Sequence, residues 1–234
     1  MLIIKGLIGG LFQLAIFSAF IIVPAGLVPG GTWLWDRALI FLVVYGLILE
    51  TTIVVMAVKA PANLEARLKP PVNKEKQPIA DRIITSIMML IGLGWFVSIP
   101  IDFFYLKLLP APLFIISISG GVFSILGFAI VVAAIFQNTF AVPTVEDQTE
   151  QGQTLVDTGL YGLVRHPLYL GLLPFMAGIA LWFGSYAATI AGVIIFLIFV
   201  IARIIVEEKS LKKTLPGYTE YMKKVRYRLI PFIW

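Results

Sequence analysis

Long apolar runs alternate with short polar segments along most of the 234-residue chain. A helix rises about 1.5 Å per residue, so about 20 apolar residues cross the ~30 Å hydrocarbon core of a bilayer. The pattern therefore predicts an all-α, polytopic membrane protein with about six transmembrane helices. The six apolar runs are Leu2–Val23, Trp33–Val58, Ile83–Pro100, Leu113–Phe136, Leu168–Phe183 and Ala187–Val206.

The fifth run, Leu168–Phe183, is the shortest and carries Pro174. Only the short link Gly184–Tyr186 separates it from the sixth run. Because so short a connection joins antiparallel neighbours, these two runs are expected to form a helical hairpin. The fifth run is expected to be tilted or to cross incompletely, which gives five full spans plus the hairpin element.

Composition agrees with a membrane protein and excludes several kinds of site. Hydrophobic residues make up 59% of the chain and charged residues 13%, whereas soluble domains average about 25% charged residues. The absence of cysteine excludes disulfides, thiolate chemistry and Cys-ligated metals, and a single histidine excludes a His-cluster metal site. Neither a dinucleotide-binding glycine fingerprint nor a P-loop pattern is present. We therefore expect no metal and no Rossmann-type cofactor site.

The clustering of basic residues predicts the orientation of the chain. Residues 59–82 hold six of the 18 lysines and arginines, and residues 207–234 hold seven. The links around residues 36–37 and 102–107 hold one each. Basic loops remain in the cytoplasm, so both basic segments and both termini are expected there. On a membrane protein such clusters report topology rather than nucleic-acid binding, and no nucleic-acid partner is expected.

Two polar segments stand apart from the spans, residues 137–165 and the tail from Glu207. A long polar loop between spans is more often functional than idle. We therefore divide the single membrane domain into helices at 1–136 and a core at 137–234. Glu50 lies inside the second apolar run, where an ionisable side chain is a functional candidate by default. Alternatively, Glu50 snorkels to the interface or hydrogen-bonds a neighbour.

The sequence "GLYGLVRHPLYLG" contains His166, the only histidine. Proline disfavours helical geometry in the residue before it and suits the first turn of a helix. His166 is therefore expected to be extended, with Pro167 opening a helix on the cytoplasmic face. Backbone N–H groups at such a helix start attract anions, and Arg165 and His166 add side-chain donors. The alternative is an Arg-His pair that contacts lipid head groups.

A second candidate group lies in "RIIVEEKSL". Arg203 and Glu207 are four residues apart, on one helix face, and Glu208 could pair with Lys212. Ordinary helix-end ion pairs would explain this spacing. However, Arg203 lies within an apolar run, where a charge is costly and usually faces a polar interior. The tail that follows is basic and aromatic, a composition that predicts anchoring at the interface.

The run "GQTLVDTGLYGLVRHPLYLG", followed by "RIIVEEKSLKKTLPGYTEYMKKVRYRLIP", closely resembles the isoprenylcysteine carboxyl methyltransferase family and its bacterial and archaeal relatives. These proteins belong with the membrane phospholipid methyltransferases. The resemblance covers roughly residues 136–231. Its specificity comes from three elements in order, L-V-x-x-G-x-Y, R-H-P-x-Y and E-E-x-x-L.

The resemblance implies S-adenosylmethionine as methyl donor, held by the loop and the tail. It implies a lipidic or lipid-attached acceptor, Arg203 and Glu207 as catalytic residues, and Arg203 as the one that faces the substrate. The chain departs from the family at Leu160, at Leu168 and in the "LPG" of the tail, which leaves the substrate class open. The matched cofactor positions are Gln148, Gln153, Leu155, Val156, Tyr161, Arg165, His166, Pro167 and Glu207.

A carboxylate acceptor is favoured, because a facing arginine suits a carboxylate and repels an amine. The alternatives are a phospholipid N-methyltransferase, an enzyme like the NADPH-dependent sterol reductases, and a non-catalytic scaffold or heme-pathway accessory protein. The reductases resemble the end of the tail, "RYRLIPFIW", and share R-H-P-x-Y. The pair Glu207-Glu208 favours the methyltransferase. The presence of Arg165, His166, Arg203 and Glu207 argues against a scaffold.

Overall fold

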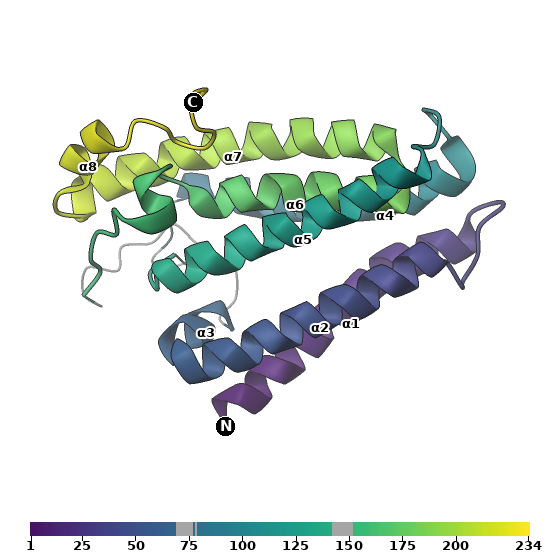
Figure 1. Ribbon diagram of the computed structural model, residues 1–234, viewed down its shortest axis with the longest axis horizontal. Helices are drawn as coiled ribbons and strands as arrows, with labels where there is room; N and C mark the ends of the chain where they lie inside the picture. The colour runs from purple at the N-terminus through teal and green to yellow at the C-terminus, as the bar shows by residue number, and fades with distance from the viewer. Residues whose placement is uncertain (69–76, 78, 142–151) are drawn as a thin grey trace.

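The computed structural model of the protein describes residues 1–68, 77, 79–141 and 152–234. The described residues form helices and loops without a strand (Figure 1). The helices are α1 (Leu2–Leu27), α2 (Asp36–Lys59), α3 (Pro61–Arg67), α4 (Ile79–Ile101), the π-helical turn η1 (Asp102–Leu106), α5 (Phe114–Gln137), the 3₁₀ turn η3 (Gly159–Gly162), α6 (Pro167–Phe183), α7 (Tyr186–Thr214) and α8 (Tyr218–Lys224).

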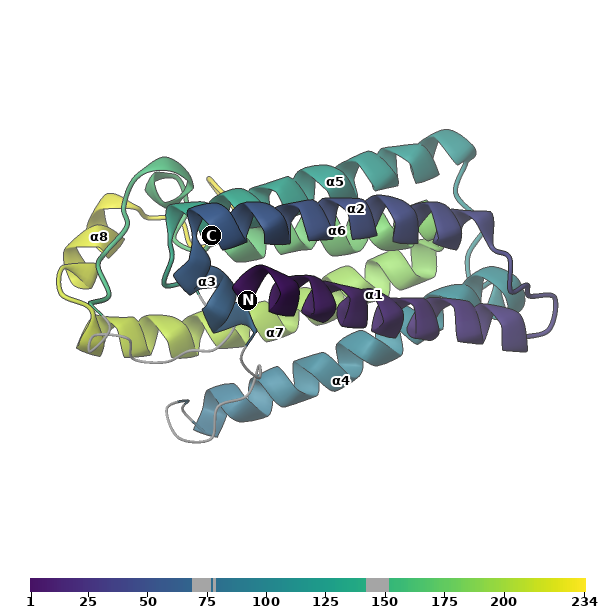
Figure 2. The same cartoon turned by 90° about the horizontal axis from the view of Figure 1, so that it is seen from below.

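Five of the described helices are long and apolar enough to cross a membrane, counting α4 and η1 as one rod. They are α1, α2, α4 with η1, α5 and α7. The shorter apolar helix α6 has 17 residues and lies among them (Figures 1 and 2). The prediction of an all-helical polytopic membrane protein with five full spans and one shorter hairpin helix is confirmed.

Helices α6 and α7 form the antiparallel hairpin expected from their short link. Gly184 ends α6 in the left-handed region, at φ 89° and ψ 26°. The Ser185 side chain then caps α7 by accepting a hydrogen bond from the Ala188 backbone N–H at 2.9 Å. Helix α7 has 29 residues and continues beyond the start of α6, so its last turns extend past the apolar layer.

Glycines allow α5 and α6 to lie in direct backbone contact. A Cβ placed on Gly127 of α5 would lie 2.5 Å from the Phe175 nitrogen and 2.6 Å from the Gly171 oxygen, both on α6. A Cβ on Gly171 would lie 2.7 Å from the Gly127 oxygen. Small residues let transmembrane helices approach closely and gain dispersion contacts, so these two helices form a closely packed pair.

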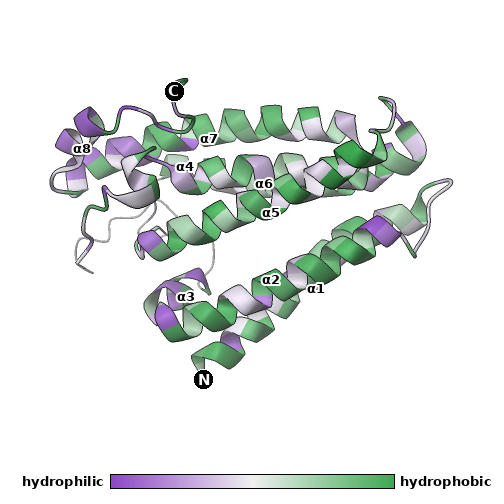
Figure 3. Ribbon diagram, in the orientation of Figure 1, coloured by the Kyte–Doolittle hydropathy of each residue, from purple (hydrophilic) through white to green (hydrophobic). Residues whose placement is uncertain are grey.

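Polar residues concentrate at the two ends of the bundle (Figure 3). One end carries α3, α8, the N-terminus and the first turn of α6, and is here called the basic end (Figure 1). Both lysine- and arginine-rich segments of the sequence approach it, residues 59–68 from one side and 207–228 from the other. Glu50 does not face this end's cavity, because its carboxyl group lies between α1 and α2, against Gly10.

We predict that the basic end faces the cytoplasm. The chain lacks cysteine, so single cysteines can report the side of the membrane without interference. Cysteines at Glu65 and Lys213 should react with an impermeant reagent only after the inner face is opened, and a cysteine at Leu108 should react in intact cells. Protection of positions 65 and 213 on opposite faces would contradict the arrangement.

Candidate active site

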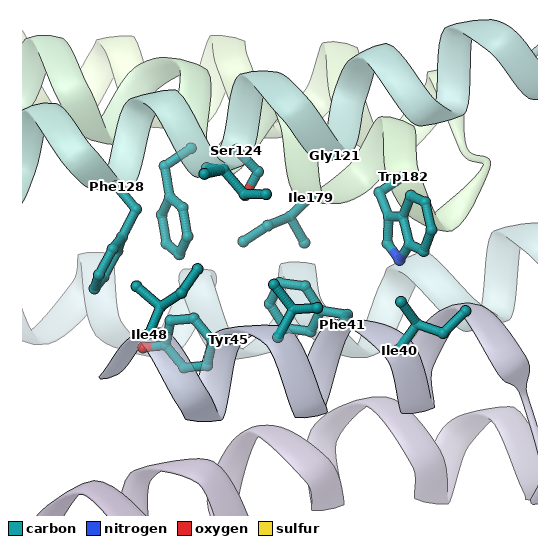
Figure 4. A pocket seen from close by; sticks show the side chains of 12 residues that line it. Ile40, Phe41, Tyr45, Ile48, Gly121, Ser124, Phe128, Ile179 and Trp182 are labelled. Carbon is teal, nitrogen blue, oxygen red and sulfur yellow. The ribbon is translucent and has the colours of Figure 1, made fainter. Parts of the chain in front are cut away.

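Two cavities differ in chemistry and therefore in what they can bind. One, of about 110 Å³, lies between α2, α5 and α6 within the apolar layer. Its wall is almost wholly hydrocarbon and aromatic, with Phe41, Tyr45 and Phe128 facing across it (Figure 4). The other, of about 380 Å³, lies at the basic end and is lined by charged, amide and hydroxyl groups as well as apolar ones. Of these two, the second suits a polar cofactor.

The cavity at the basic end, here called the site cavity, lies over the first turn of α6. The projecting part of α7 forms one wall, and residues 152–161 and α8 close over it. Every described residue in the predicted set lines the site cavity, and Gln148 lies outside the described residues. The lining residues of that set are Gln153, Leu155, Val156, Tyr161, Arg165, His166, Pro167, Arg203 and Glu207.

The start of α6 follows the expected geometry in outline. Pro167 is the first helical residue, and His166 is the N-cap with φ −125° and ψ 63°. The backbone of His166 is therefore outside the helical region, although its ψ is smaller than in a regular extended strand. The backbone N–H groups of Arg165 and His166 donate to the carbonyl oxygens of Tyr227 and Arg228, each at 2.9 Å. The tail thus runs alongside the Arg-His-Pro segment.

Glu208 is the centre of a buried ionic cluster that sequence spacing misassigned. Its carboxylate accepts hydrogen bonds from Arg165 Nε at 2.8 Å and Arg228 Nε at 3.0 Å, and lies 3.4 Å from His166 Nε2. Its partners are therefore Arg165 and Arg228, not Lys212. Side-chain exposure is 5% for Arg165 and 4% for Glu208, so this pair is removed from water.

Arg165 acts mainly as a structural connection. Besides Glu208, its guanidinium donates through Nη1 to the carbonyl oxygens of Val225 at 2.8 Å and Arg226 at 2.9 Å. Buried guanidinium groups require such partners to offset desolvation. Arg165 thus holds the tail against α7 while one side of it borders the site cavity.

Glu207 points into the site cavity, unlike Glu208 beside it. Tyr169 Oη donates to Glu207 Oε2 at 3.0 Å, and His166 Nδ1 lies 3.8 Å from Glu207 Oε1. The Glu207 side chain is 27% exposed. Successive residues of a helix point about 100° apart, which explains how adjacent glutamates face a cavity and a buried cluster.

Arg203 has a different partner from the one its spacing suggested. Its Nε lies 3.3 Å from Asp81 Oδ1, on α4, with side-chain exposures of 6% and 0%. The i,i+4 spacing had instead suggested Glu207 as the partner of Arg203. The Glu207 carboxylate contacts Tyr169 and His166. Asp81 explains how an arginine is accommodated in an apolar run. No local signal in the sequence connects these two residues.

Several further residues of the site were not predicted. Tyr218 and Tyr221 of α8 line the site cavity and are 3% and 4% exposed, so they are not the interfacial anchors expected from the tail's composition. Arg67 of α3 also lines it, donating to Asn63 Oδ1 at 3.0 Å and to the Ala141 carbonyl. The sequence does not distinguish a buried aromatic residue from an exposed one, so the burial of these tyrosines could not be predicted.

Burial affects the charges of several groups around the site cavity. It raises the pKa of the Tyr161 hydroxyl, with Glu207 as a further cause, and that of Tyr218, with Glu208 as a further cause. Both hydroxyls are therefore neutral donors at physiological pH. Desolvation lowers the pKa of Arg67 to about 10, which leaves this guanidinium protonated near neutrality.

Two polar atoms of the site cavity lack a hydrogen-bond partner among the described residues. They are Gln153 Oε1 and Tyr218 Oη, and both are buried. A buried polar atom without a partner costs about 1–3 kcal/mol, so such atoms are normally paired with protein, water or a ligand. Their position in the cavity wall is that expected of groups that bind a polar ligand.

The fold and site together define a polytopic helical membrane protein with a polar cavity where its helices leave the apolar layer. Residues 115–216 match the family model described as phospholipid methyltransferase. This match spans a little under half of the 234-residue chain and shows a similarity to that family. The matched segment runs from α5 through α7 and includes the Arg-His-Pro segment and both glutamates.

A solved structure shares the fold of this chain. The chain is similar to a eukaryotic intramembrane Ras methyltransferase, isoprenylcysteine carboxyl methyltransferase, with a TM-score of 0.59 and 19% identity. The similarity covers 94% of this chain and 74% of that one. A comparison with curated protein sequences finds no match. At this identity the likeness establishes the fold, and the substrate has to be argued from the site.

Proposed function

We propose that the protein is an S-adenosylmethionine-dependent methyltransferase that esterifies a carboxylate on a lipidic or small acid at the membrane–cytoplasm interface. The observation that carries this proposal is the site cavity itself. Unpaired polar groups lie in its wall, Arg203 and other charged groups line it as well, and apolar side chains line much of the rest. Such a cavity can receive a polar methyl donor and an amphipathic acceptor together.

The described residues fit S-adenosylmethionine. Gln153 and Tyr218 offer buried hydrogen-bonding atoms, and the Glu207 carboxylate offers an anion for the donor's cationic groups. Leu155 and Val156 provide an apolar surface for the adenine ring. When bound, the donor supplies an electrophilic methyl group. The protein's residues hold it in the cavity and exclude competing water.

The acceptor side of the site cavity is apolar apart from Arg203. A guanidinium can hold a carboxylate through two parallel hydrogen bonds, which fixes the direction of the attacking oxygen. A carboxylate is already nucleophilic, so no general base is needed, and orientation alone can supply roughly 7–11 kcal/mol. The apolar residues that would contact a hydrocarbon chain are Met88, Val131, Ile135, Leu172, Phe196 and Val200.

Phospholipid N-methylation is the second candidate function. The description of the matched family model favours it, and so does the ion pair of Arg203 with Asp81, which lowers the net positive charge that an amine would meet. The two functions give different products. Methyl esters release methanol in base, whereas methylated amines do not.

The type of acceptor can be identified in membranes. Membranes containing the protein are incubated with methyl-labelled S-adenosylmethionine, and the product is then treated with base. Volatile label indicates a methyl ester and supports the carboxylate proposal. Base-stable label in the lipid fraction would replace it with phospholipid methylation.

We predict that the purified protein binds S-adenosylmethionine with a Kd in the micromolar range, on the order of −7 to −8 kcal/mol. His166→Ala and Glu207→Gln should each weaken binding about tenfold or more, because each leaves a cofactor group unpaired in a confined site. Calorimetric titration in detergent measures both effects.

The matched control is Glu220→Gln, an exposed glutamate of α8 that does not line the site cavity. It should bind the cofactor as the wild type does. Wild-type affinity in both His166→Ala and Glu207→Gln would remove these residues from the binding site. Titration with reduced nicotinamide cofactor gives a further check, since the sterol-reductase alternative requires the protein to bind this cofactor.

A further inference from the structure

Asp81 lies behind Arg203, close to the start of α4. Asp81, Thr85 and Met88 follow the i, i+4, i+7 spacing of one helix face, and Met88 lines the site cavity. This face of α4 is therefore turned toward α7 and the cavity. Asp81 itself has an exposure of 0% and is in contact with Arg203, which lines the site cavity.

Two described side chains, on either side of it, contact the Asp81 carboxyl group. Oδ1 lies 3.3 Å from Arg203 Nε, and Oδ2 accepts a hydrogen bond from Gln77 Nε2 at 2.5 Å. Desolvating two charges costs several kcal/mol, and a well-packed apolar pair in their place would often be as stable. A buried ion pair against the candidate acceptor site therefore invites an explanation beyond stability.

The chemistry of ester formation provides an explanation for the buried pair of Asp81 and Arg203. An acceptor carboxylate oxygen forms the new bond to the methyl carbon while the bond from that carbon to sulfur breaks, and the bonding pair leaves with sulfur. A negative carboxylate and a positive sulfonium become a neutral ester and a neutral thioether, with no proton transferred. Because charge disappears during the reaction, a group that binds the carboxylate strongly stabilises the reactant more than the transition state and slows the reaction.

We propose that Asp81 is a positioning residue that weakens the electrostatic hold of Arg203 on the acceptor carboxylate, so that Arg203 orients this group without over-stabilising it. The inference rests on the proposed esterification. The Asp81 carboxylate fixes the guanidinium from its Nε edge and offsets part of its charge. The acceptor carboxylate then binds weakly and keeps its nucleophilicity.

The sign of the effect distinguishes this role from a structural one. Asp81→Asn keeps the size of the side chain and removes its charge. Binding of N-acetyl-S-farnesylcysteine, measured without cofactor, should tighten about tenfold, and kcat should fall about tenfold, so KM and kcat decrease together. Loss of mere structural support would instead weaken binding and raise KM. Asp81→Glu should retain the wild-type probe affinity and kcat. If Asp81→Asn does not fold, Asp81→Ser takes its place and should likewise tighten probe binding and lower kcat.

Three controls isolate the route through Arg203. In an Arg203→Gln background, Asp81→Asn should change neither the probe affinity nor kcat, because residues that act through one another are not additive. Asp102→Asn removes a buried carboxylate at the opposite end of the same rod, where Asp102 accepts from Ser185 Oγ at 2.6 Å. It should leave probe affinity unchanged. The carboxamide of the probe should bind equally to wild type and Asp81→Asn.

The failures of the inference and of the proposed function differ. If the wild type forms only base-stable methyl products, the esterification fails and the inference fails with it. If the wild type forms esters but Asp81→Asn weakens probe binding, the inference alone is overturned. The same holds if Asp81→Asn changes probe affinity and kcat as much in the Arg203→Gln background as in the wild type. The expected result is tighter binding with slower turnover, dependent on Arg203.

Discussion

Replacing Glu208 with alanine is expected to lower the free energy of unfolding by about 3–5 kcal/mol. The substitution leaves Arg165 without its carboxylate partner in a position where its side chain is only 5% exposed. It also removes the partner of Arg228 and the group beside His166 Nε2. An uncompensated buried cation is among the most destabilising changes that a single substitution makes.

Loss of Glu208 should also disturb the site. The backbone N–H groups of residues 165 and 166 form hydrogen bonds with the tail. These hydrogen bonds depend on the Arg165 side chain staying between α7 and the carbonyl oxygens of Val225 and Arg226. Release of this contact frees the tail and the orientation of His166. We therefore expect Glu208→Ala to lose stability and S-adenosylmethionine binding together.

Thermal unfolding and titration in detergent test this expectation, with two comparisons. Lys212→Ala removes the exposed residue that spacing suggested as the partner and should change neither property. Glu207→Ala should weaken binding with little loss of stability, because its carboxylate faces the site cavity and is 27% exposed. Equal unfolding temperatures for Glu208→Ala and the wild type would show that the buried cluster does not stabilise the fold.

The second large effect is expected for Gly127→Leu. A side chain on Gly127 would meet the backbone of Phe175 at 2.5 Å and of Gly171 at 2.6 Å. Backbone atoms cannot rotate aside as a side chain can, so α5 and α6 would have to separate. Overpacking typically costs about 1–3 kcal/mol and occasionally more. Because α6 carries Pro167 and Tyr169 into the site cavity, separation should also abolish cofactor binding.

Gly94→Ala on α4 provides the matched control, because a Cβ at Gly94 has no atom within 4 Å among the described residues. Alanine favours a helix over glycine by about 1 kcal/mol, so Gly94→Ala should be neutral or slightly stabilising. Unfolding in detergent and the yield of monodisperse protein measure both variants. If Gly127→Leu were as stable as Gly94→Ala, direct backbone contact between α5 and α6 would be excluded.

The positions of the helices followed from the sequence with little help from tertiary structure. Membrane-spanning segments are selected by the hydrophobicity of consecutive residues, which is a local property. The hairpin of α6 and α7 was equally local, since only Gly184 and Ser185 separate the two helices. Pro167 likewise marked the start of α6, because its fixed φ suits the first turn.

The residue types of the candidate site were also visible in the sequence, since a histidine and several charges beside apolar runs are unusual. The partners of these residues were not visible in the sequence. Asp81 pairs with Arg203 and Glu208 with Arg165 through helices that are distant in the chain. Local spacing had suggested Glu207 and Lys212 in these roles, because on an isolated helix only i+3 and i+4 neighbours are within reach.

The sequence by itself determined the membrane class of the protein, its helices and the segment that carries the candidate chemistry, because hydrophobic length and proline geometry act locally. Tertiary structure decided which charges are buried together, which of two adjacent glutamates faces the cavity, and that Tyr218 and Tyr221 belong to its wall. These properties depend on how α4, α6, α7 and α8 approach one another. That approach is set by close contacts such as Gly192 of α7 against Trp95 of α4, whose effect no single segment reveals.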